Sequence, residues 1–368
     1  MITTKKIVMA GLIVPALFLG LFLVNEMITR STPERTLRQN QLGNVYKKTP
    51  ESQLPTQAVA QAANGYYLPS SVGKEYGTWV WKSANTMTLT EMKRVISNAS
   101  LKGVNVIYLT IDDYLNIYSL PESKNKTNRK AKYLTNLETF VRLASEADIQ
   151  VDTEAGWRDW SKPANRWKGL ALIDFTAEYN RLKQYKVRGF QYDVEPYLLT
   201  EYESNKASVL REYMEYLDIS SKKIATADLA FSVVIPHFYD AGQQWTPSFE
   251  YNGTTTYAFN HILRILNTIP QNTSVVIMAY RNFAEGENGV NQISEVEVQD
   301  ASALSDNKTP MIIAQESGNV EPNYVTYYGW WYEDYLEQIT LVQNHFMPFQ
   351  AYGGMAIHYL DTLMLLKQ

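Results

Sequence analysis

The stretch VRGFQYDVEPY, residues 187–197, combines a short apolar strand pattern with two closely spaced acids. Side chains alternate between the two faces of a strand, so Asp193 and Glu195 share one face with Gln191 while the apolar side chains between them face the opposite way. Pro196 then ends the strand, because proline cannot donate to a ladder. Two carboxyls at one strand end repel each other and lose solvent, so we expect a raised pKa suited to a general acid. A structural ion pair or a helix-capping acid is the alternative.

Short apolar strands alternate with helical patterns on both sides of this stretch. Strands are predicted over residues 77–81, 104–111, 149–153, 187–193, 230–235, 274–279, 311–315 and 354–357. Helices are predicted over residues 90–101, 134–147, 173–185, 206–219, 257–266, 294–304 and 332–346. Buried strands joined through helices pair in parallel, and eight such units in about 290 residues are typical of a closed (β/α)8 TIM barrel. An open doubly wound sheet is the alternative, but eight evenly spaced units favour the barrel.

Composition excludes several classes of site. The 368-residue chain has 34 basic and 38 acidic residues and a net charge of −4, which argues against a nucleic-acid binder that works by bulk charge. It has no cysteine, so disulfides, thiolate catalysis and cysteine-based zinc sites are excluded. Its four histidines are far apart and form no HExxH motif, so we predict no metal site and no cofactor.

The N-terminal region resembles a targeting segment followed by a linker. Lys5 and Lys6 precede an uncharged run over residues 7–24, with no small-residue cleavage site close behind it. We therefore predict a signal anchor over residues 1–30, a polar linker over 31–73 and the barrel over 74–368. This places the barrel outside the cytoplasmic membrane; a cleaved signal peptide, and hence a secreted protein, is the alternative.

Parallel strands of a barrel carry their chemistry at their carboxyl ends. The predicted strand ends bring acids, aromatic rings, histidines and an arginine to one rim. In chain order the rim residues are Trp81, Asp112, Asp113, Asp152, Glu154, Trp157, Asp193, Glu195, His237, Tyr280, Arg281, Glu316 and His358. Carboxyls can transfer protons to a glycosidic oxygen and flat rings can stack on sugars, so the rim predicts cleavage of a polysaccharide. Salt bridges to Lys82, Arg158 or Arg281 are the structural alternative for any single acid.

Three motifs resemble the family 18 chitinase-like glycoside hydrolases. They are GFQYDVE over residues 189–195, Met278-Ala279-Tyr280, and Gly353-Gly354 before the last strand. The resemblance implies a barrel from about Tyr76 to Gln368, with Glu195 protonating the glycosidic oxygen. It implies that Asp193 orients a substrate acetamido group, which itself attacks the anomeric carbon, and that Tyr280 hydrogen-bonds that group.

Three positions depart from the family pattern. Gln191 stands where the family has its first Asp, which weakens charge coupling to Asp193. Arg281 replaces the Asp that follows the family's strand-six Tyr, and His358 stands where a Trp forms the floor of the sugar site. These departures bear on recognition of an N-acetylated sugar more than on glycosidase activity in general.

A second resemblance is to the clan A retaining glycosidases. Glu195-Pro196 and the segment Gln315-Glu316-Ser317-Gly318 are similar to the paired glutamates of that clan, with Glu195 as acid/base and Glu316 as nucleophile. The clan has Asn directly before the first of these glutamates, where this chain has Val194.

A barrel that binds polysaccharide without cutting it is a third hypothesis, because a fold does not guarantee activity. In every case the expected partners are a polysaccharide and, through residues 1–30, the membrane. We predict no nucleic-acid or protein partner.

Overall fold

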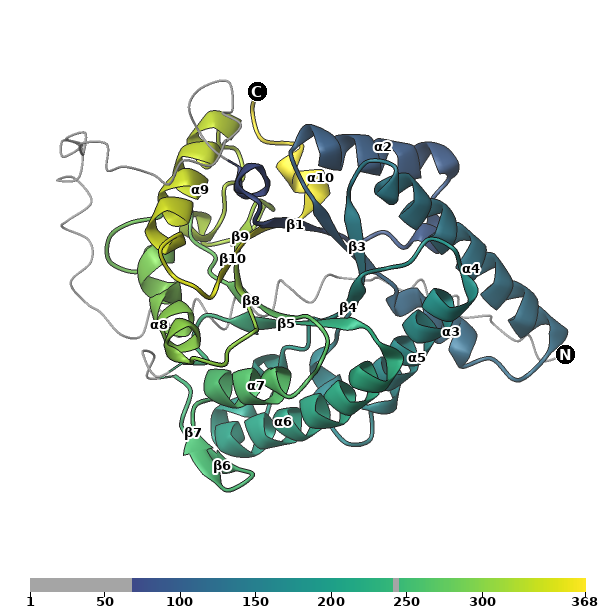
Figure 1. The fold of residues 1–368 in the computed structure, drawn as a ribbon, viewed down its shortest axis with the longest axis horizontal. Helices are drawn as coiled ribbons and strands as arrows, with labels where there is room; N and C mark the ends of the chain where they lie inside the picture. Colours follow the sequence, from purple (N-terminus) through teal and green to yellow (C-terminus); the bar gives the residue numbers. More distant parts are fainter. Residues whose placement is uncertain (1–67, 241–244) are drawn as a thin grey trace, which may run out of the picture.

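The structure, a computed structural model, describes residues 68–240 and 245–368. Eight parallel strands close into a barrel, seen as the central ring of Figure 1, in the order β1-β10-β9-β8-β5-β4-β3-β2. They are β1 Glu75–Val80, β2 Val106–Thr110, β3 Gln150–Ala155, β4 Gly189–Tyr192, β5 Ala230–Pro236, β8 Thr273–Met278, β9 Met311–Glu316 and β10 Tyr352–His358. The predicted (β/α)8 barrel is thereby confirmed.

Helices surround the ring of strands (Figure 1). They are α2 Leu89–Leu101, α3 Leu115–Tyr118, α4 Lys124–Ser145, α5 Trp167–Leu182, α6 Tyr202–Ala227, α7 Ala258–Asn267, α8 Val290–Ala303, α9 Tyr332–Phe346 and α10 Leu360–Leu363. A small antiparallel hairpin of β6 Phe249–Tyr251 and β7 Thr254–Thr256 follows β5 and contacts α6. The sequence pattern did not predict this hairpin or the two shortest helices, because segments of three or four residues have too little periodicity to detect.

The predicted anchor lies outside the described residues, as does the predicted linker up to residue 67. The last residues of the predicted linker, 68–73, are part of the barrel domain. Pro69–Val72 form a short 3₁₀ helix, and Leu68 packs against the core. No helix within the described residues is both long and apolar enough to cross a membrane.

Two apolar layers hold the barrel. The larger lies between the strands and the helices, and there Tyr192 of β4 stacks on Tyr216 of α6 with ring centroids 5.2 Å apart. A smaller cluster fills the barrel interior and includes Trp79 and Tyr108. The interior amide of Gln191 donates to Ser232 Oγ at 3.2 Å. The two faces predicted for the fourth strand are therefore correct.

Asp152 does not lie at the carboxyl end of its strand, contrary to the sequence prediction. Strand β3 continues to Ala155, two residues beyond its predicted end, so Asp152 lies lower in the barrel. There it receives two hydrogen bonds from Arg188, from Nε at 2.9 Å and Nη2 at 2.5 Å, and Arg188 also binds Glu75 at 2.7 Å. Tyr108 donates its hydroxyl to the same Glu75. This buried network closes the amino end of the barrel.

We expect Arg188→Met to destabilise the fold by about 3–5 kcal/mol, because it leaves the Asp152 carboxylate, 2% exposed, without its partner. Chemical denaturation of the full-length protein measures this loss. The matched control is Arg142→Met, which removes an exposed i,i+4 pair with Glu146 and should cost about 0.3–0.5 kcal/mol. Equal effects of the two substitutions would contradict a structural role for the buried network.

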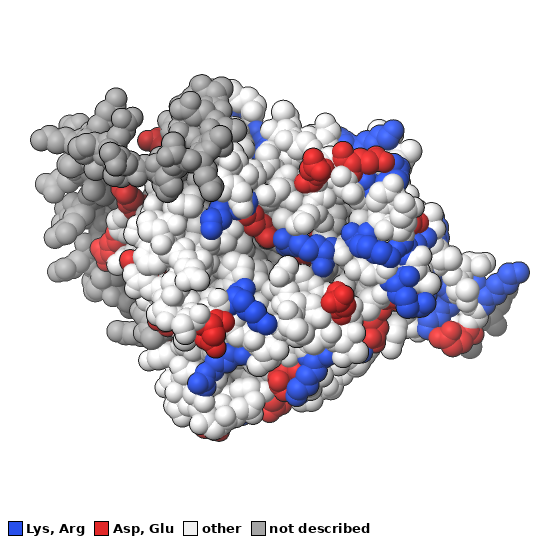
Figure 2. Space-filling model, in the orientation of Figure 1, with Lys and Arg blue, Asp and Glu red and all other residues white. Residues whose placement is uncertain are grey.

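Surface charge is mixed on the face shown in Figure 2. Lysines and arginines lie there beside acids on a largely uncharged surface.

Candidate functional site

Four strand-end residues converge at the carboxyl end of the barrel. Asp193 and Glu195 follow β4, Tyr280 follows β8, and Glu316 ends β9. The pKa of Tyr280 is raised well above its usual value by burial and by the charges of Glu316, Asp193 and Glu195. Its hydroxyl is therefore a hydrogen-bond donor at neutral pH and lies within electrostatic range of all three carboxyls. The structure thus brings together residues from three strands that are spread over more than a hundred positions of the sequence.

Glu195 is a partly exposed acid of this group. It directly precedes a 3₁₀ turn, Pro196–Leu198, which bends the chain away from the strand. The turn carries Tyr197 back over the carboxyl, and its hydroxyl donates to Glu195 Oε1. Burial raises the pKa of Glu195, while the hydrogen bond from Tyr197 acts in the opposite direction. The result is an acid that holds its proton to higher pH than an ordinary glutamate, as proton donation requires.

Asp193 lies beside Glu195, among other acidic side chains. Burial, followed by the charges of Glu195 and Asp112, raises the pKa of Asp193 well above its usual value. The loop after β3 passes very close: a Cβ at Gly156 would lie 1.7 Å from the Asp193 carbonyl oxygen, so only glycine fits there. Asp193 thus has a raised pKa next to Glu195, and the loop after β3 packs tightly against its backbone.

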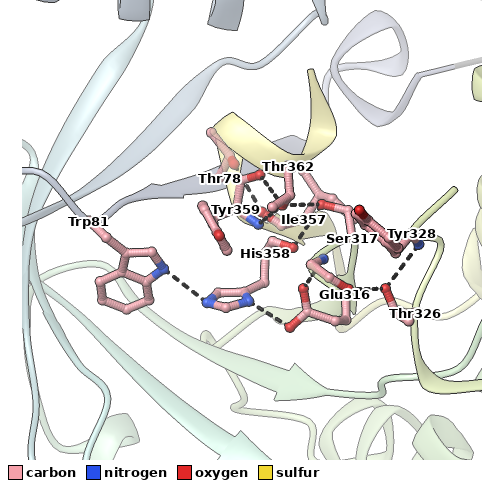
Figure 3. A network of polar contacts seen from close by, with 11 residues as sticks. Thr78, Trp81, Glu316, Ser317, Thr326, Tyr328, Ile357, His358, Tyr359 and Thr362 are labelled. Carbon is pink, nitrogen blue, oxygen red and sulfur yellow. Dashed lines mark hydrogen bonds and ion pairs between the residues drawn. The ribbon is translucent and has the colours of Figure 1, made fainter. Parts of the chain in front are cut away.

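Trp81, His358 and Glu316 form a chain of hydrogen bonds across the other side of the site (Figure 3). Trp81 Nε1 lies 2.9 Å from His358 Nε2, and His358 Nδ1 lies 2.7 Å from Glu316 Oε2. An indole N–H can only donate, so His358 Nε2 accepts and Nδ1 carries the proton toward the carboxylate. This tautomer holds the Trp81 ring, 38% exposed, at the mouth of the barrel.

Glu316 itself is closed off from solvent. Its side chain is 0% exposed, its Oε1 accepts from the backbone N–H of Gly318, and its Oε2 faces His358. Ser317 and Thr326 complete the surrounding polar contacts, as Figure 3 shows. A carboxylate with both oxygens bound inside the protein is suited to positioning His358 rather than to attacking a substrate carbon.

A second acidic group extends from Asp193 toward β3 and β2. Asp112 follows β2 in a 3₁₀ turn, Asp112–Tyr114, and Glu154 lies on β3 directly opposite Gln191 of β4. Burial and Asp113 raise the pKa of Asp112 to about 7. Burial, Asp112 and Asp193 raise the pKa of Glu154 well above its usual value. These acids interact with one another and therefore share one region of the rim.

The remaining predicted residues lie around this centre. His237 is 6% exposed, with its Nδ1 3.3 Å from the carbonyl oxygen of Met278, and burial and Arg281 lower its pKa to about 3. Arg281 is also buried; it donates to the Tyr280 carbonyl at 2.7 Å and lies over the Tyr324 ring. Trp157 is 40% exposed and donates to Asp159 at 2.9 Å.

Tyr197 is the residue of the site that the sequence analysis missed. The signal was present in Glu195-Pro196-Tyr197, since a proline directly after a strand starts a turn that can return the side chain two positions on. Lys82, considered as a partner for the rim acids, instead pairs with Glu91 at 2.6 Å. Within the described parts of the chain, no three His, Asp or Glu side chains are grouped to hold a metal ion.

Comparison with known proteins gives matches in structure alone. No protein-family model matches the chain, and no curated protein sequence matches it. Similar solved structures include an exo-β-1,4-mannosidase from Opitutaceae bacterium strain TAV5, with 10% identity and a TM-score of 0.48 over 84% of this chain and 55% of the mannosidase. They include an endo-1,4-β-mannanase from Rhizomucor miehei, with 10% identity and a TM-score of 0.48 over 82% and 87% of the two chains. A GH18 chitinase from Pseudoalteromonas aurantia has 14% identity and a TM-score of 0.45 over 79% and 98%. The chain thus spans about half the length of the mannosidase.

Proposed function

We propose that this protein is a glycoside hydrolase that cleaves a polysaccharide containing N-acetylhexosamine, with Glu195 as its general acid. The observation that carries the proposal is the setting of Glu195: a partly exposed carboxyl of raised pKa at the carboxyl end of a barrel, hydrogen-bonded by Tyr197 and flanked by Asp193. A proton donor of this kind lowers the barrier to departure of a sugar oxygen.

The reaction follows the mechanism that the chitinase-like motifs imply. Glu195 gives its proton to the glycosidic oxygen as the bond from that oxygen to the anomeric carbon breaks. The carbonyl oxygen of the substrate's own acetamido group attacks the anomeric carbon and forms a cyclic cation. The Glu195 carboxylate then takes a proton from a water molecule. The oxygen of that water bonds to the anomeric carbon, and the bond between this carbon and the acetamido oxygen breaks. Asp193 and Tyr280 orient the acetamido group, and burial together with the neighbouring acids raises the pKa of both, which favours their protonated forms.

The paired-glutamate mechanism is the less favoured alternative. It requires Glu316 to reach the anomeric carbon, whereas the Glu316 carboxylate is fully buried and binds His358 and Gly318. In the proposed enzyme, Glu316 and His358 are positioning residues that hold Trp81 as an aromatic surface for a sugar ring.

Release of reducing ends from a panel of N-acetylated and non-acetylated polysaccharides tests the proposal. The expected result is cleavage by the wild type of glycans with N-acetylhexosamine, and no cleavage of the same glycans after chemical removal of their acetyl groups, because a free amine has no carbonyl oxygen to attack with. Glycan binding without release of reducing ends would instead support the non-catalytic barrel.

The proposal includes a location for the barrel on the outer side of the membrane, held by residues 1–30 and a linker. The two lysines before the apolar run of residues 7–24 support this orientation. External protease added to intact cells should digest the barrel domain, while a cytoplasmic control protein survives. Protection of the domain until the cells are lysed would contradict the proposed location.

Tyr197→Phe should move the alkaline limb of the kcat/KM profile to higher pH. The Tyr197 hydroxyl stabilises the charged form of Glu195, so its loss raises the pKa of that acid further and keeps it protonated to higher pH. The control is Tyr239→Phe, which removes a nearby buried hydroxyl that has no hydrogen-bond partner. If the alkaline limb of Tyr197→Phe stays at the same pH or moves to lower pH, the Tyr197 hydroxyl does not lower the pKa of Glu195.

A further inference from the structure

Several buried acceptor atoms beside the proton donor lack a hydrogen-bond partner within the protein. They are Asp112 Oδ1, Glu154 Oε2, Asp193 Oδ1 and Gln191 Oε1. Glu154 is 1% exposed and Gln191 is 0% exposed. A buried acceptor that finds no donor costs about 1–3 kcal/mol, and more when it is charged. Four such atoms in one region indicate that their donors come from a ligand.

The four atoms lie in one region of the barrel rather than at scattered sites. Glu154 and Gln191 are direct neighbours in the β3–β4 register. The Gln191 amide nitrogen donates to Ser232 on β5, which leaves its oxygen on the opposite side, toward Glu154 on β3. Glu154 interacts electrostatically with both Asp112 and Asp193. We call Asp112, Glu154 and Gln191 the acceptor pocket.

Two nearby acids, Asp113 and Asp152, have partners for their carboxyl groups within the protein. Asp113 accepts from Tyr133 at 2.6 Å and from Asn85 at 3.3 Å, and Asp152 is paired with Arg188. By contrast, no lysine, arginine or histidine of the described chain forms an ion pair with Asp112 or Glu154. Asp113 and Asp152 are satisfied by the fold, whereas each residue of the acceptor pocket keeps one oxygen without a partner.

A ligand can reach the acceptor pocket from the rim. Asp112 and Asp193 are partly exposed, whereas Glu154 and Gln191 are buried on β3 and β4. The pocket lies on the β2–β3 side of Asp193, and Tyr280, which follows β8, lies on the other side. With the reacting sugar at Glu195 and Tyr280, the acceptor pocket lies on the side of the neighbouring unit that faces β2 and β3.

We propose that the acceptor pocket binds the ammonium group of a de-N-acetylated hexosamine unit, next to the unit whose bond is cleaved. The inference rests on the proposed function and deepens it: the substrate is a partly de-N-acetylated polysaccharide. An ammonium group has three donors and no acceptor, and its positive charge stabilises the ionised forms of Asp112 and Glu154, whose pKa values are raised by burial and by repulsion from neighbouring acids. A sugar hydroxyl supplies one donor and leaves that repulsion in place. The described residues provide no metal-binding group there.

Binding of defined oligosaccharides to the full-length protein in detergent tests this assignment. The probes are the fully N-acetylated β-1,4-linked glucosamine tetramer and the four tetramers that each have one free amine. Every protein in this comparison also carries Glu195→Gln, which prevents cleavage of the probes during the measurement. One positional isomer should bind about tenfold more tightly than the acetylated tetramer, in keeping with the gain from charged hydrogen bonds.

Asp112→Asn and Glu154→Gln should each reduce that preference to within about twofold, because each replaces a carboxylate that binds the ammonium group. Asp113→Asn is the matched control: it removes an equal charge one residue away, and the preference should remain. Thermal unfolding of each variant confirms that it is folded before binding is compared.

Two results would overturn the assignment: affinities for all four amine isomers no higher than for the acetylated tetramer, or a preference that survives in the Asp112→Asn, Glu154→Gln double variant. Failure of the ammonium site is distinct from failure of the proposed function. An enzyme that releases reducing ends but shows no amine preference lacks only the ammonium site, whereas a protein that binds the amine isomer and never releases reducing ends lacks the hydrolase activity.

Discussion

Glu195→Gln should lower kcat by about 10²–10⁴ while changing substrate affinity little, because the amide keeps the shape of the side chain but cannot give up a proton. The measurement is steady-state release of reducing ends, with oligosaccharide binding followed separately. The wild-type rate should also fall as pH rises through the pKa of Glu195, since only the protonated acid is active and burial raises that pKa.

Two controls sharpen this prediction. Glu203→Gln alters an acid on α6 that is 55% exposed and should leave the rate unchanged. Substrates with a good leaving group, such as nitrophenyl glycosides, need little protonation, so Glu195→Gln should slow them less than it slows the polysaccharide. A full rate on polysaccharide in Glu195→Gln would remove this residue from the chemistry and with it the proposed mechanism.

Asp193→Asn and Glu316→Gln should differ sharply in their effects. Loss of the Asp193 carboxyl should cost about 100-fold or more in kcat, because the acetamido group loses the contact that holds it in line for attack. Glu316→Gln should cost about tenfold, chiefly through KM, because it disturbs the hydrogen bond that fixes His358 and, through it, Trp81.

The paired-glutamate mechanism predicts the reverse order. If Glu316 were the nucleophile, Glu316→Gln would lower kcat on the order of 10⁴-fold, and a 2-fluoro sugar substrate would leave a covalent sugar on this residue. Mass spectrometry of the digested protein detects such an adduct. Finding it on Glu316 would refute the proposed role of Asp193. His358→Gln gives an independent check, because it should raise KM with little change in kcat if His358 acts only through Trp81.

Much of the barrel could be predicted because its determinants are local. Alternating apolar side chains predict the strands, and each predicted strand overlaps an observed one. Since strand ends follow from the same pattern, Glu195, Tyr280, Glu316 and His358 were correctly expected at one end of the barrel. Asp152 was misplaced because a two-residue error at the end of β3 moves a side chain from the rim into the barrel interior.

Roles within the rim depended on contacts that no local pattern contains. The sequence shows two glutamates after strands as equivalent candidates, but burial makes them different: Glu195 is partly open, whereas Glu316 is enclosed by His358, 42 residues away. The Trp81–His358 hydrogen bond spans 277 positions and exists only because the first and last strands close the barrel.

The amino-acid sequence by itself therefore determined the eight-strand architecture and the set of acids and aromatic rings at its carboxyl end, because the period of side chains along a strand is a local property. Tertiary structure alone decided which carboxyls are satisfied by the protein and which are left for a ligand. The physical reason is that burial and hydrogen-bond partners come from loops of different strands, brought together when the barrel closes.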